Sequence, residues 1–152
     1  RRQSVAEIMA QHWRDYGRDY YTRHDYEAVD KAAAEALVQN LRDRLAALPG
    51  QSFAGLTVTA ADDFAYTDPV DGSTSAKQGL RVFFEGDARA VFRLSGTGTE
   101  GATLRVYLER YEPDPAKQGE DPQAALASVI SAAAALAEIA PRLGRDAPDV
   151  RT

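Results

Sequence analysis

The spacing of hydrophobic residues changes twice along this chain, and that change limits the folds it can adopt. Apolar residues recur at helical spacing up to about residue 48, alternate with polar residues from about residue 56 to 112, and return to helical spacing from about residue 123. A period of 3.6 indicates amphipathic helices, and a period of 2 indicates half-buried strands. The order therefore predicts an α+β fold, with an antiparallel sheet of about four strands and helices packed on one face.

Two helices are expected before residue 50. Ser4 and Glu7 have the spacing of a capping box, which predicts a helix over 5–16 that Gly17 can end. Asp30 can cap a second helix over 31–48, and Pro49 with Gly50 would end it. The segment between them is rich in tyrosine and charged residues, and we expect it to be irregular or a short extended strip.

Four strands and a last helix are expected after residue 50, joined by segments rich in turn-forming residues. In order, they are a strand over 56–68 with a possible bulge at 62–63, a loop over 68–79, a hairpin over 80–95 that turns near 86–87, a strand over 103–112, a proline-rich connection, and a helix over about 123–143.

Composition excludes several classes of protein. The chain has 152 residues, enough for one domain with a core, and its net charge of −5 argues against binding nucleic acid. No apolar stretch is long enough to span a membrane. The chain has no cysteine and only two histidines, His12 and His24, without metal-ligand spacing; both are expected to be structural or exposed. A cytoplasmic setting fits these features. The first residue is Arg1, not Met, which suggests a piece of a longer protein.

A loop of small and hydroxyl residues lies between two strands and two arginines. In "RLSGTGTEGATLR", Arg93 and Arg105 flank the hydroxyls of Ser95, Thr97 and Thr99, and glycines stand between them at Gly96, Gly98 and Gly101. Arginine forks, hydroxyls and accessible amides are the groups that bind a phosphate. The segment from 89 to 105 has a net charge of +2, although the chain is acidic. The alternative is an ordinary glycine-rich hairpin with two surface arginines.

The sequence "RLSGTGTEGATLRVY" resembles the phosphate-binding loop of the C-terminal domain of α-D-phosphohexomutases, in particular the phosphoglucomutase branch. Four more segments are similar to the same branch in the same order: "HWRDYGRDYYTRHDYE" at 12–27, "FAYTDPVDGSTSAKQGLRVFF" at 64–84, "DPQAAL" at 121–126 and "RLGRDAPDVRT" at 142–152. The resemblance extends from about Val5 to Thr152. It implies a lead-in helix and linker from a preceding domain over 1–30 and a phosphate-binding C-terminal domain over 31–152.

The resemblance also implies an activity. Family members interconvert glucose 1-phosphate and glucose 6-phosphate through an active-site phosphoserine and a glucose 1,6-bisphosphate intermediate, with the help of Mg²⁺. Their C-terminal domain binds the phosphate that is not being transferred and closes the active-site cleft. Carried over to this sequence, the binding residues are Arg93, Ser95, Gly96, Thr97, Gly98 and Arg105, with Thr99 beside them. The implied partners are a phosphosugar and the other domains of the same enzyme.

Other family motifs are absent from this chain. It lacks the T-A-S-H-type serine motif, the D-G-D-x-D-R-like metal loop and the G-E-E-S-like sugar loop. The segment "FEGDARAVF" has one aspartate, Asp87, and is expected to be a hairpin turn. The chain alone is therefore expected to be catalytically inactive, with no catalytic residue and no Mg²⁺ ligand. Glu100 is a mild departure from the family pattern, because a carboxylate beside a phosphate site repels the phosphate. The alternative function is a freestanding phosphosugar-binding module, or an inactive relative that acts through protein contacts.

Three further features have structural interpretations. Trp13 and the nearby tyrosines are expected to pack the first helix onto the domain or a neighbour. Asp68 and Asp71 lack the spacing of a calcium loop and are expected to order their loop by side-chain to backbone hydrogen bonds. Lys77 could contact a ligand, but we do not assign it to the site.

Overall fold

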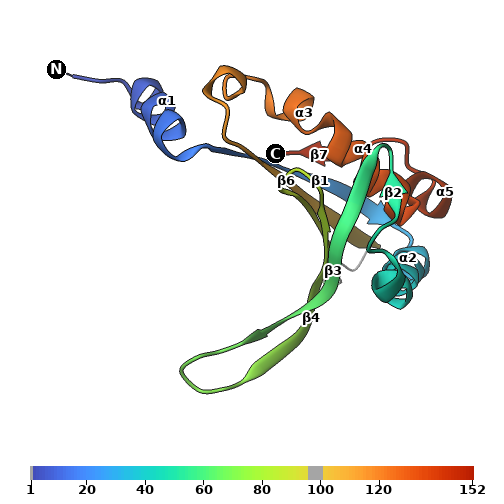
Figure 1. The fold of residues 1–152 in the computed structure, drawn as a ribbon. Helices are drawn as coiled ribbons and strands as arrows, with labels where there is room; N and C mark the ends of the chain where they lie inside the picture. Colours follow the sequence, from blue (N-terminus) through green and yellow to red (C-terminus); the bar gives the residue numbers. More distant parts are fainter. Residues whose placement is uncertain (1, 96–100) are drawn as a thin grey trace.

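The fold is a strongly curved antiparallel sheet with helices on one face (Figure 1). The computed structural model describes residues 2–95 and 101–152. Within these residues the strands are β1 (Arg18–Val29), β2 (Ser52–Phe53), β3 (Leu56–Thr67), β4 (Thr74–Phe84), β5 (Ala88–Ser95), β6 (Ala102–Glu112) and β7 (Val150–Arg151). The helices are α1 (Val5–Tyr16), α2 (Lys31–Arg44), α3 (Pro122–Ala125), α4 (Ala127–Ala137) and α5 (Ile139–Leu143).

The described strands form one sheet in the order β2-β3-β4-β5-β6-β1-β7. The α+β class and the covering of one face by helices agree with the sequence analysis, but the sheet has seven strands instead of about four. The additional strands are β1 and the short strands β2 and β7. The hairpin of β4 and β5 turns where predicted, at residues 85–87, so "FEGDARAVF" is a hairpin turn.

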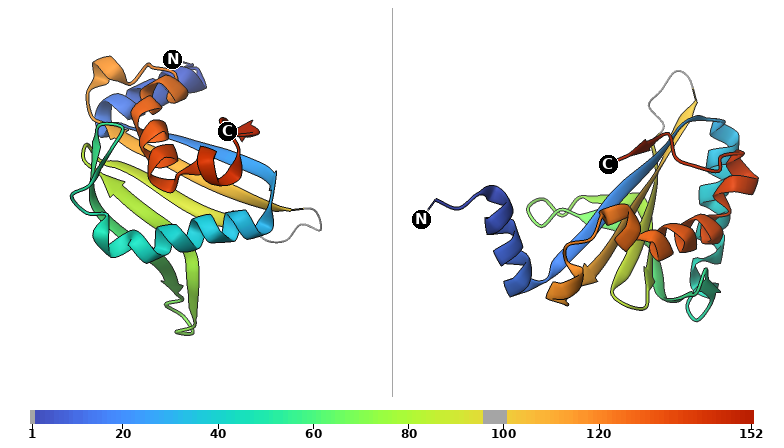
Figure 2. Two further views of the ribbon diagram at one scale, coloured as in Figure 1. Left: turned by 90° about the vertical axis from the view of Figure 1, so that its right-hand side faces the viewer. Right: turned by 90° about the horizontal axis from the view of Figure 1, so that it is seen from above.

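The core lies between the sheet and the helices α2 and α4. Leu37 and Leu41 of α2 and Leu136 of α4 are buried against sheet residues such as Phe92 and Leu104. Figure 2 shows α2, α4 and α5 on the same side of the sheet. The face of the sheet opposite these helices, formed by the residues that alternate with the core residues, is not covered by any of them. We name it the open face.

β1 is a strand of twelve residues, and the expectation of an irregular or short extended segment was wrong. It pairs with β6 from Arg18 to Val29, with an irregularity between Tyr26 and Val29. Its buried side carries the polar residues Thr22 and His24, so the apolar alternation that marks a strand is weak. Gln123 satisfies both: its Nε2 donates to Thr22 Oγ1 (2.7 Å), and its Oε1 lies 2.9 Å from His24 Nε2. The predicted division of the chain at residue 30 stays a prediction.

The capping box of α1 is confirmed, with Ser4 accepting from the Glu7 amide and Glu7 accepting from the Ser4 amide. Arg18 stacks between the rings of Trp13 and Tyr20, 4.1 Å from each ring centroid, which joins α1 to β1. Tyr16 and Tyr21 remain largely exposed. The expected packing is therefore confirmed for Trp13 and Tyr20, but not for Tyr16 and Tyr21.

The helix predicted over 31–48 ends earlier, because α2 stops at Arg44 and a 3-10 turn covers Leu45–Ala47. The last predicted helix is interrupted twice. Leu126 is not helical, and Glu138 has a left-handed backbone conformation with φ 53° between α4 and α5. Arg44 donates to the Leu136 carbonyl at the end of α4 (2.8 Å). Alanine favours helix in this stretch, but Pro141 cannot donate an amide hydrogen bond to the carbonyl of Ala137 four residues earlier, which favours the break between α4 and α5.

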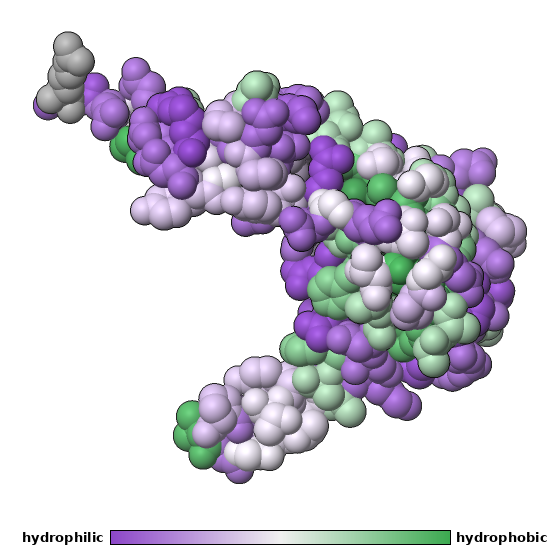
Figure 3. Space-filling model, viewed as in Figure 1, coloured by the Kyte–Doolittle hydropathy of each residue, from purple (hydrophilic) through white to green (hydrophobic). Residues whose placement is uncertain are grey.

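The distal halves of β3 and β4 project from the sheet as a long arm. Residues 74–79, expected in a loop, belong to β4, and the register shifts lie between Val58 and Ala60 and between Phe64 and Tyr66, not at residues 62–63. In the turn, Asp68 Oδ1 accepts from the Val70 amide and Asp71 Oδ1 from the Ser73 amide, as expected. Figure 3 shows the arm as mostly pale or hydrophilic, with a small hydrophobic spot at its tip, and Val70 in the turn is 93% exposed.

None of the helices in the described ranges is long and apolar enough to cross a membrane.

The burial of His24 leads to a prediction about how the stability of the fold depends on pH. Burial lowers the pKa of His24 below its usual value of 6.5. A histidine whose pKa is lowered by folding contributes full stability above its unfolded pKa, and that contribution is lost as the pH falls from 6.5 towards the folded pKa. In His24→Gln, the free energy of unfolding should therefore fall less steeply between pH 7 and 5 than in the parent chain. Urea unfolding at several pH values measures this. Parallel pH profiles for the two proteins would contradict it.

Candidate functional site

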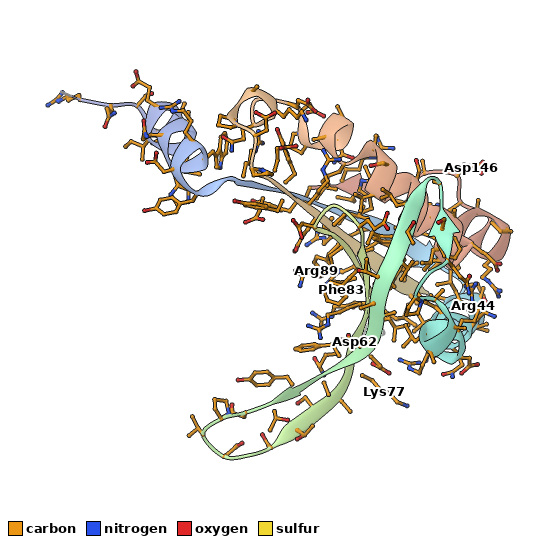
Figure 4. All side chains as sticks on the ribbon, in the orientation of Figure 1. Arg44, Asp62, Lys77, Phe83, Arg89 and Asp146 are labelled. Carbon is orange, nitrogen blue, oxygen red and sulfur yellow. The ribbon has the colours of Figure 1, made fainter. Side chains whose placement is uncertain are left out.

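The open face carries a concentration of arginines. Figure 4 shows Asp62, Phe83 and Arg89 on the side of the sheet away from α2 and α4. The register places five arginines on this face: Arg23 on β1, Arg81 on β4, Arg89 and Arg93 on β5, and Arg105 on β6. Each alternates with buried neighbours, such as Phe92 beside Arg93 and Leu104 beside Arg105. The sheet therefore presents these charges to one side while its other side forms the core.

Three of these arginines are bound to carboxylates, and the first of them, Arg23, donates from Nε to Asp25 Oδ1 at 2.9 Å. Arg81 makes a bidentate pair with Asp62, with Nε to Oδ1 at 2.8 Å and Nη2 to Oδ2 at 2.6 Å, and it stacks on Phe64 at 4.5 Å from the ring centroid. The hydrogen bonds from Arg81 lower the pKa of Asp62. Arg89 forms an ion pair with Glu109. These guanidiniums already have partners for their charge.

Arg93 and Arg105 differ from them. They occupy one cross-strand pair, in which Arg93 on β5 lies directly opposite Arg105 on β6. Neither donates a hydrogen bond to any residue within 2–95 or 101–152, and the Nε atom of Arg105 is buried without a partner there. Like charges directly opposite one another destabilise a strand pair. Such a pair is favourable when an anion lies between its members.

Gly79 leaves the space that Arg93 occupies. A Cβ atom at position 79 would lie 3.0 Å from Arg93 Cγ and 3.2 Å from Val91 Cγ1. Two hollows meet here: one of about 720 Å³ between α2 and β4, which Lys77 also lines, and one of about 540 Å³ on the open face. Gln78, Gly79 and Arg93 line both. The Arg93 side chain is therefore accessible from two sides.

The structure describes three of the seven predicted site residues. Arg93 and Arg105 face each other as the hairpin geometry predicts, and Ser95 is the last residue of β5, opposite Thr103. Gly96, Thr97, Gly98 and Thr99, together with Glu100, lie outside the described residues. The binding role of all seven stays a prediction.

The sequence analysis missed two residues next to the opposed arginines. Asp25 on β1 is the cross-strand neighbour of Arg105, and Gly79 underlies Arg93. The alternation of buried and exposed positions in β1 would have placed Asp25 beside Arg105, but only once β1 was identified as a strand next to β6.

Within the described residues, no group of three or more His, Cys, Asp and Glu side chains is arranged to hold a metal ion. His24 is buried against Gln123, and His12 is exposed on α1. The Mg²⁺ that the resemblance implies is therefore not assigned to any of these residues.

Comparison with known families identifies the chain. Residues 18–149 match the family model described as "Phosphoglucomutase-1, C-terminal domain". The match begins at the start of β1 and ends just before β7, so it includes all of the sheet's long strands.

Curated relatives match the chain over nearly its whole length. A phosphoglucomutase of Rhizobium radiobacter is 57% identical over 152 residues, covering 100% of the chain and 28% of the relative. A cytoplasmic phosphoglucomutase of Pisum sativum is 48% identical and covers 98% of the chain and 27% of the relative. Phosphoglucomutase-1 of Homo sapiens is 46% identical, and the match covers 100% of the chain and 28% of the relative. The chain thus spans little more than a quarter of the length of these relatives.

A solved structure has the same fold. The open form of parafusin, a phosphoglucomutase from Paramecium, superposes with a TM-score of 0.84 at 39% identity. The match covers 98% of this chain and 25% of that one.

Gly101 yields a prediction about how the loop after β5 returns to the sheet. Its φ is +78°, and a Cβ atom there would lie 2.9 Å from the Val29 carbonyl oxygen. Gly72 is a matched control, because its φ is +72° and nothing lies within 4 Å of an added Cβ. Both alanine variants carry the strain of a left-handed conformation, about 1–2 kcal/mol. Gly101→Ala should reduce the free energy of unfolding by about 1 kcal/mol or more beyond Gly72→Ala, as measured by urea unfolding. Equal losses would mean that the contact with β1 does not constrain Gly101.

Proposed function

We propose, from the premise that the chain belongs to the phosphoglucomutase family and matches its C-terminal domain, that the chain binds a phosphosugar through one phosphate group. That group is the phosphate that is not transferred in the reaction. The observation that carries the proposal is the cross-strand pair of Arg93 and Arg105, which brings two like charges together on the open face. A phosphate monoester with two negative charges is the ligand that turns this repulsion into attraction, since guanidinium forks match phosphate oxygens bidentately.

The loop from Ser95 to Thr99 completes the proposed site. Hydroxyls and glycine amides can take the phosphate oxygens that the arginines leave unbound. The binding residues that we propose are therefore Arg93, Ser95, Gly96, Thr97, Gly98, Thr99 and Arg105. Remote phosphate binding of this kind contributes to catalysis by orienting the reacting end of the sugar, not by taking part in the bond changes.

The chemistry that we propose belongs to a complete enzyme that contains this chain. It interconverts glucose 1-phosphate and glucose 6-phosphate by way of a phosphoserine and glucose 1,6-bisphosphate, with Mg²⁺ bound by residues outside this chain. The chain itself lacks the serine, metal and sugar motifs, so we propose that it is inactive alone. Closure of this domain on the others would exclude water from the reacting phosphate. A cytoplasmic setting is consistent with the absence of cysteine.

Arg105→Ala tests the proposal in this chain. NMR titration of the isotope-labelled chain with glucose 6-phosphate, glucose 1-phosphate and inorganic phosphate should shift the amides of residues 95–99 and 105, similarly for all three ligands. The Arg105→Ala variant should lose on the order of 1.5–3 kcal/mol of binding free energy, as expected for a hydrogen bond to a charged group.

Arg110→Ala is the matched control for this titration. Arg110 lies on the same strand as Arg105, but on the other side of the sheet, because it is five positions further along and successive side chains alternate between the two faces. Its replacement should leave the affinity for all three ligands unchanged. Equal losses in the two variants would indicate a general charge effect. No response of the parent chain at millimolar ligand would contradict the proposed function.

A further inference from the structure

Asp25 is a buried carboxylate on the open face. It lies on β1 as the cross-strand neighbour of Arg105, and its side chain is only 4% exposed. Burying a carboxylate is unfavourable unless opposite charges and hydrogen-bond donors compensate for the lost water. Neighbouring residues are therefore expected to compensate for the burial of the Asp25 carboxylate.

Two guanidiniums share this carboxylate unequally. Arg23 donates from Nε to Asp25 Oδ1 at 2.9 Å, which is a charge-assisted hydrogen bond. The Nε atom of Arg105 lies 3.9 Å from the other oxygen, Oδ2. That distance permits attraction but not a hydrogen bond. Asp25 thus attracts Arg105 without occupying its donors.

The exposure of the Arg105 side chain indicates that its other N–H donors are accessible. The side chain is 42% exposed although its Nε is buried and lacks a hydrogen bond to any described residue. The exposure must therefore lie in other atoms of the side chain. The register runs Arg93, Arg105, Asp25 across three neighbouring strands, so Asp25 attracts Arg105 from the side opposite to Arg93. This attraction counteracts the repulsion between the two arginines.

The charges of this group fit the proposed ligand. Arg23, Arg93 and Arg105 with Asp25 have a net charge of +2. A phosphate monoester has close to two negative charges at neutral pH. Without Asp25 the group would have a net charge of +3 and Arg105 would lose its nearest opposite charge. With Asp25 but without Arg23, the carboxylate would be left to Arg105 alone and would compete with a phosphate for its donors.

We propose that Asp25 is a positioning residue that acts through Arg105, and that Arg23 keeps the carboxylate from binding Arg105 too tightly. The inference rests on the proposed function, because positioning matters only if Arg105 binds phosphate. It assigns to β1 a part in the site that the glycine-rich loop does not supply. Asp25 need not touch the ligand.

The direction in which Asp25→Asn changes the affinity for phosphate distinguishes a positioning role from a passive one. If Asp25 were a bystander, Asp25→Asn would remove a negative charge near a dianion and would tighten binding. If Asp25 positions Arg105, the same substitution should weaken binding of glucose 6-phosphate about tenfold, in spite of the more favourable charge, because Arg105 would lose the nearby charge that holds it in place. In an Arg105→Ala background, Asp25→Asn should cause no further weakening.

The Nε–H group of Arg105 supplies a readout that does not depend on ligand. In the ¹⁵N-labelled chain, Asp25→Asn should shift this signal and speed its hydrogen exchange with water. Arg23→Ala should change both in the opposite direction, because the carboxylate is then left to Arg105. Arg23 is 35% exposed, so this variant is expected to fold even if Asp25→Asn does not. Asp62→Asn, which breaks the separate pair with Arg81, is the matched control and should leave the Arg105 signal unchanged.

The outcomes distinguish this inference from the proposed function. If the parent chain fails to bind glucose 6-phosphate, the proposed function fails, while the Arg105 signal still decides whether Asp25 positions it. If the ligand binds but the Arg105 signal is the same in the parent chain, Asp25→Asn and Arg23→Ala, the positioning role is overturned. Tighter binding in Asp25→Asn would also overturn it.

Discussion

The sheet buries one face against the helices α2 and α4, and the rest of the structure depends on that division. Residues such as Phe92, Leu104 and Val106 contact α2 and α4 on one side. Because side chains alternate along a strand, the residues between them must project from the other side. A shift of one residue in the pairing of β5 with β6 would exchange the two sets and bury arginines in the core. The hydrophobic core therefore fixes the register, and the register fixes the positions of Arg93 and Arg105.

Charges on the open face form two kinds of group. Arg81 with Asp62 and Arg89 with Glu109 are pairs that neutralise themselves. Arg105 has only the longer contact with Asp25, at 3.9 Å, and Arg93 has no ion pair within residues 2–95 and 101–152. A group with excess positive charge next to neutral pairs would attract a small anion to one place on the face, as the proposed function requires, in a protein whose overall charge is −5.

Local patterns in the sequence predict the elements whose signals are strong. The Ser4–Glu7 capping box locates α1 correctly, and the alternation of leucine and valine with polar residues locates β6. The opposed arginines follow from the same alternation, because two strands joined by one loop must pair antiparallel. The candidate site could be predicted to that extent.

Elements that depend on distant partners could not be predicted in the same way. β1 buries Thr22 and His24, and Gln123, about a hundred residues away, provides their hydrogen bonds. Asp25 becomes part of the site only through that strand. For β1, the tertiary contacts outweigh the local preference. The break at Glu138 has a local signal that the prediction of one helix over 123–143 overlooked: Pro141 has no amide hydrogen to donate to the carbonyl of Ala137, the last residue of α4.

A crystal structure of the chain with glucose 6-phosphate would test the central claim most directly. The account predicts phosphate oxygens within hydrogen-bond distance of the guanidiniums of both Arg93 and Arg105, with Asp25 still beside Arg105 and the sugar extending away from the sheet. A phosphate bound elsewhere, or bound at one arginine while the other turns away, would contradict it.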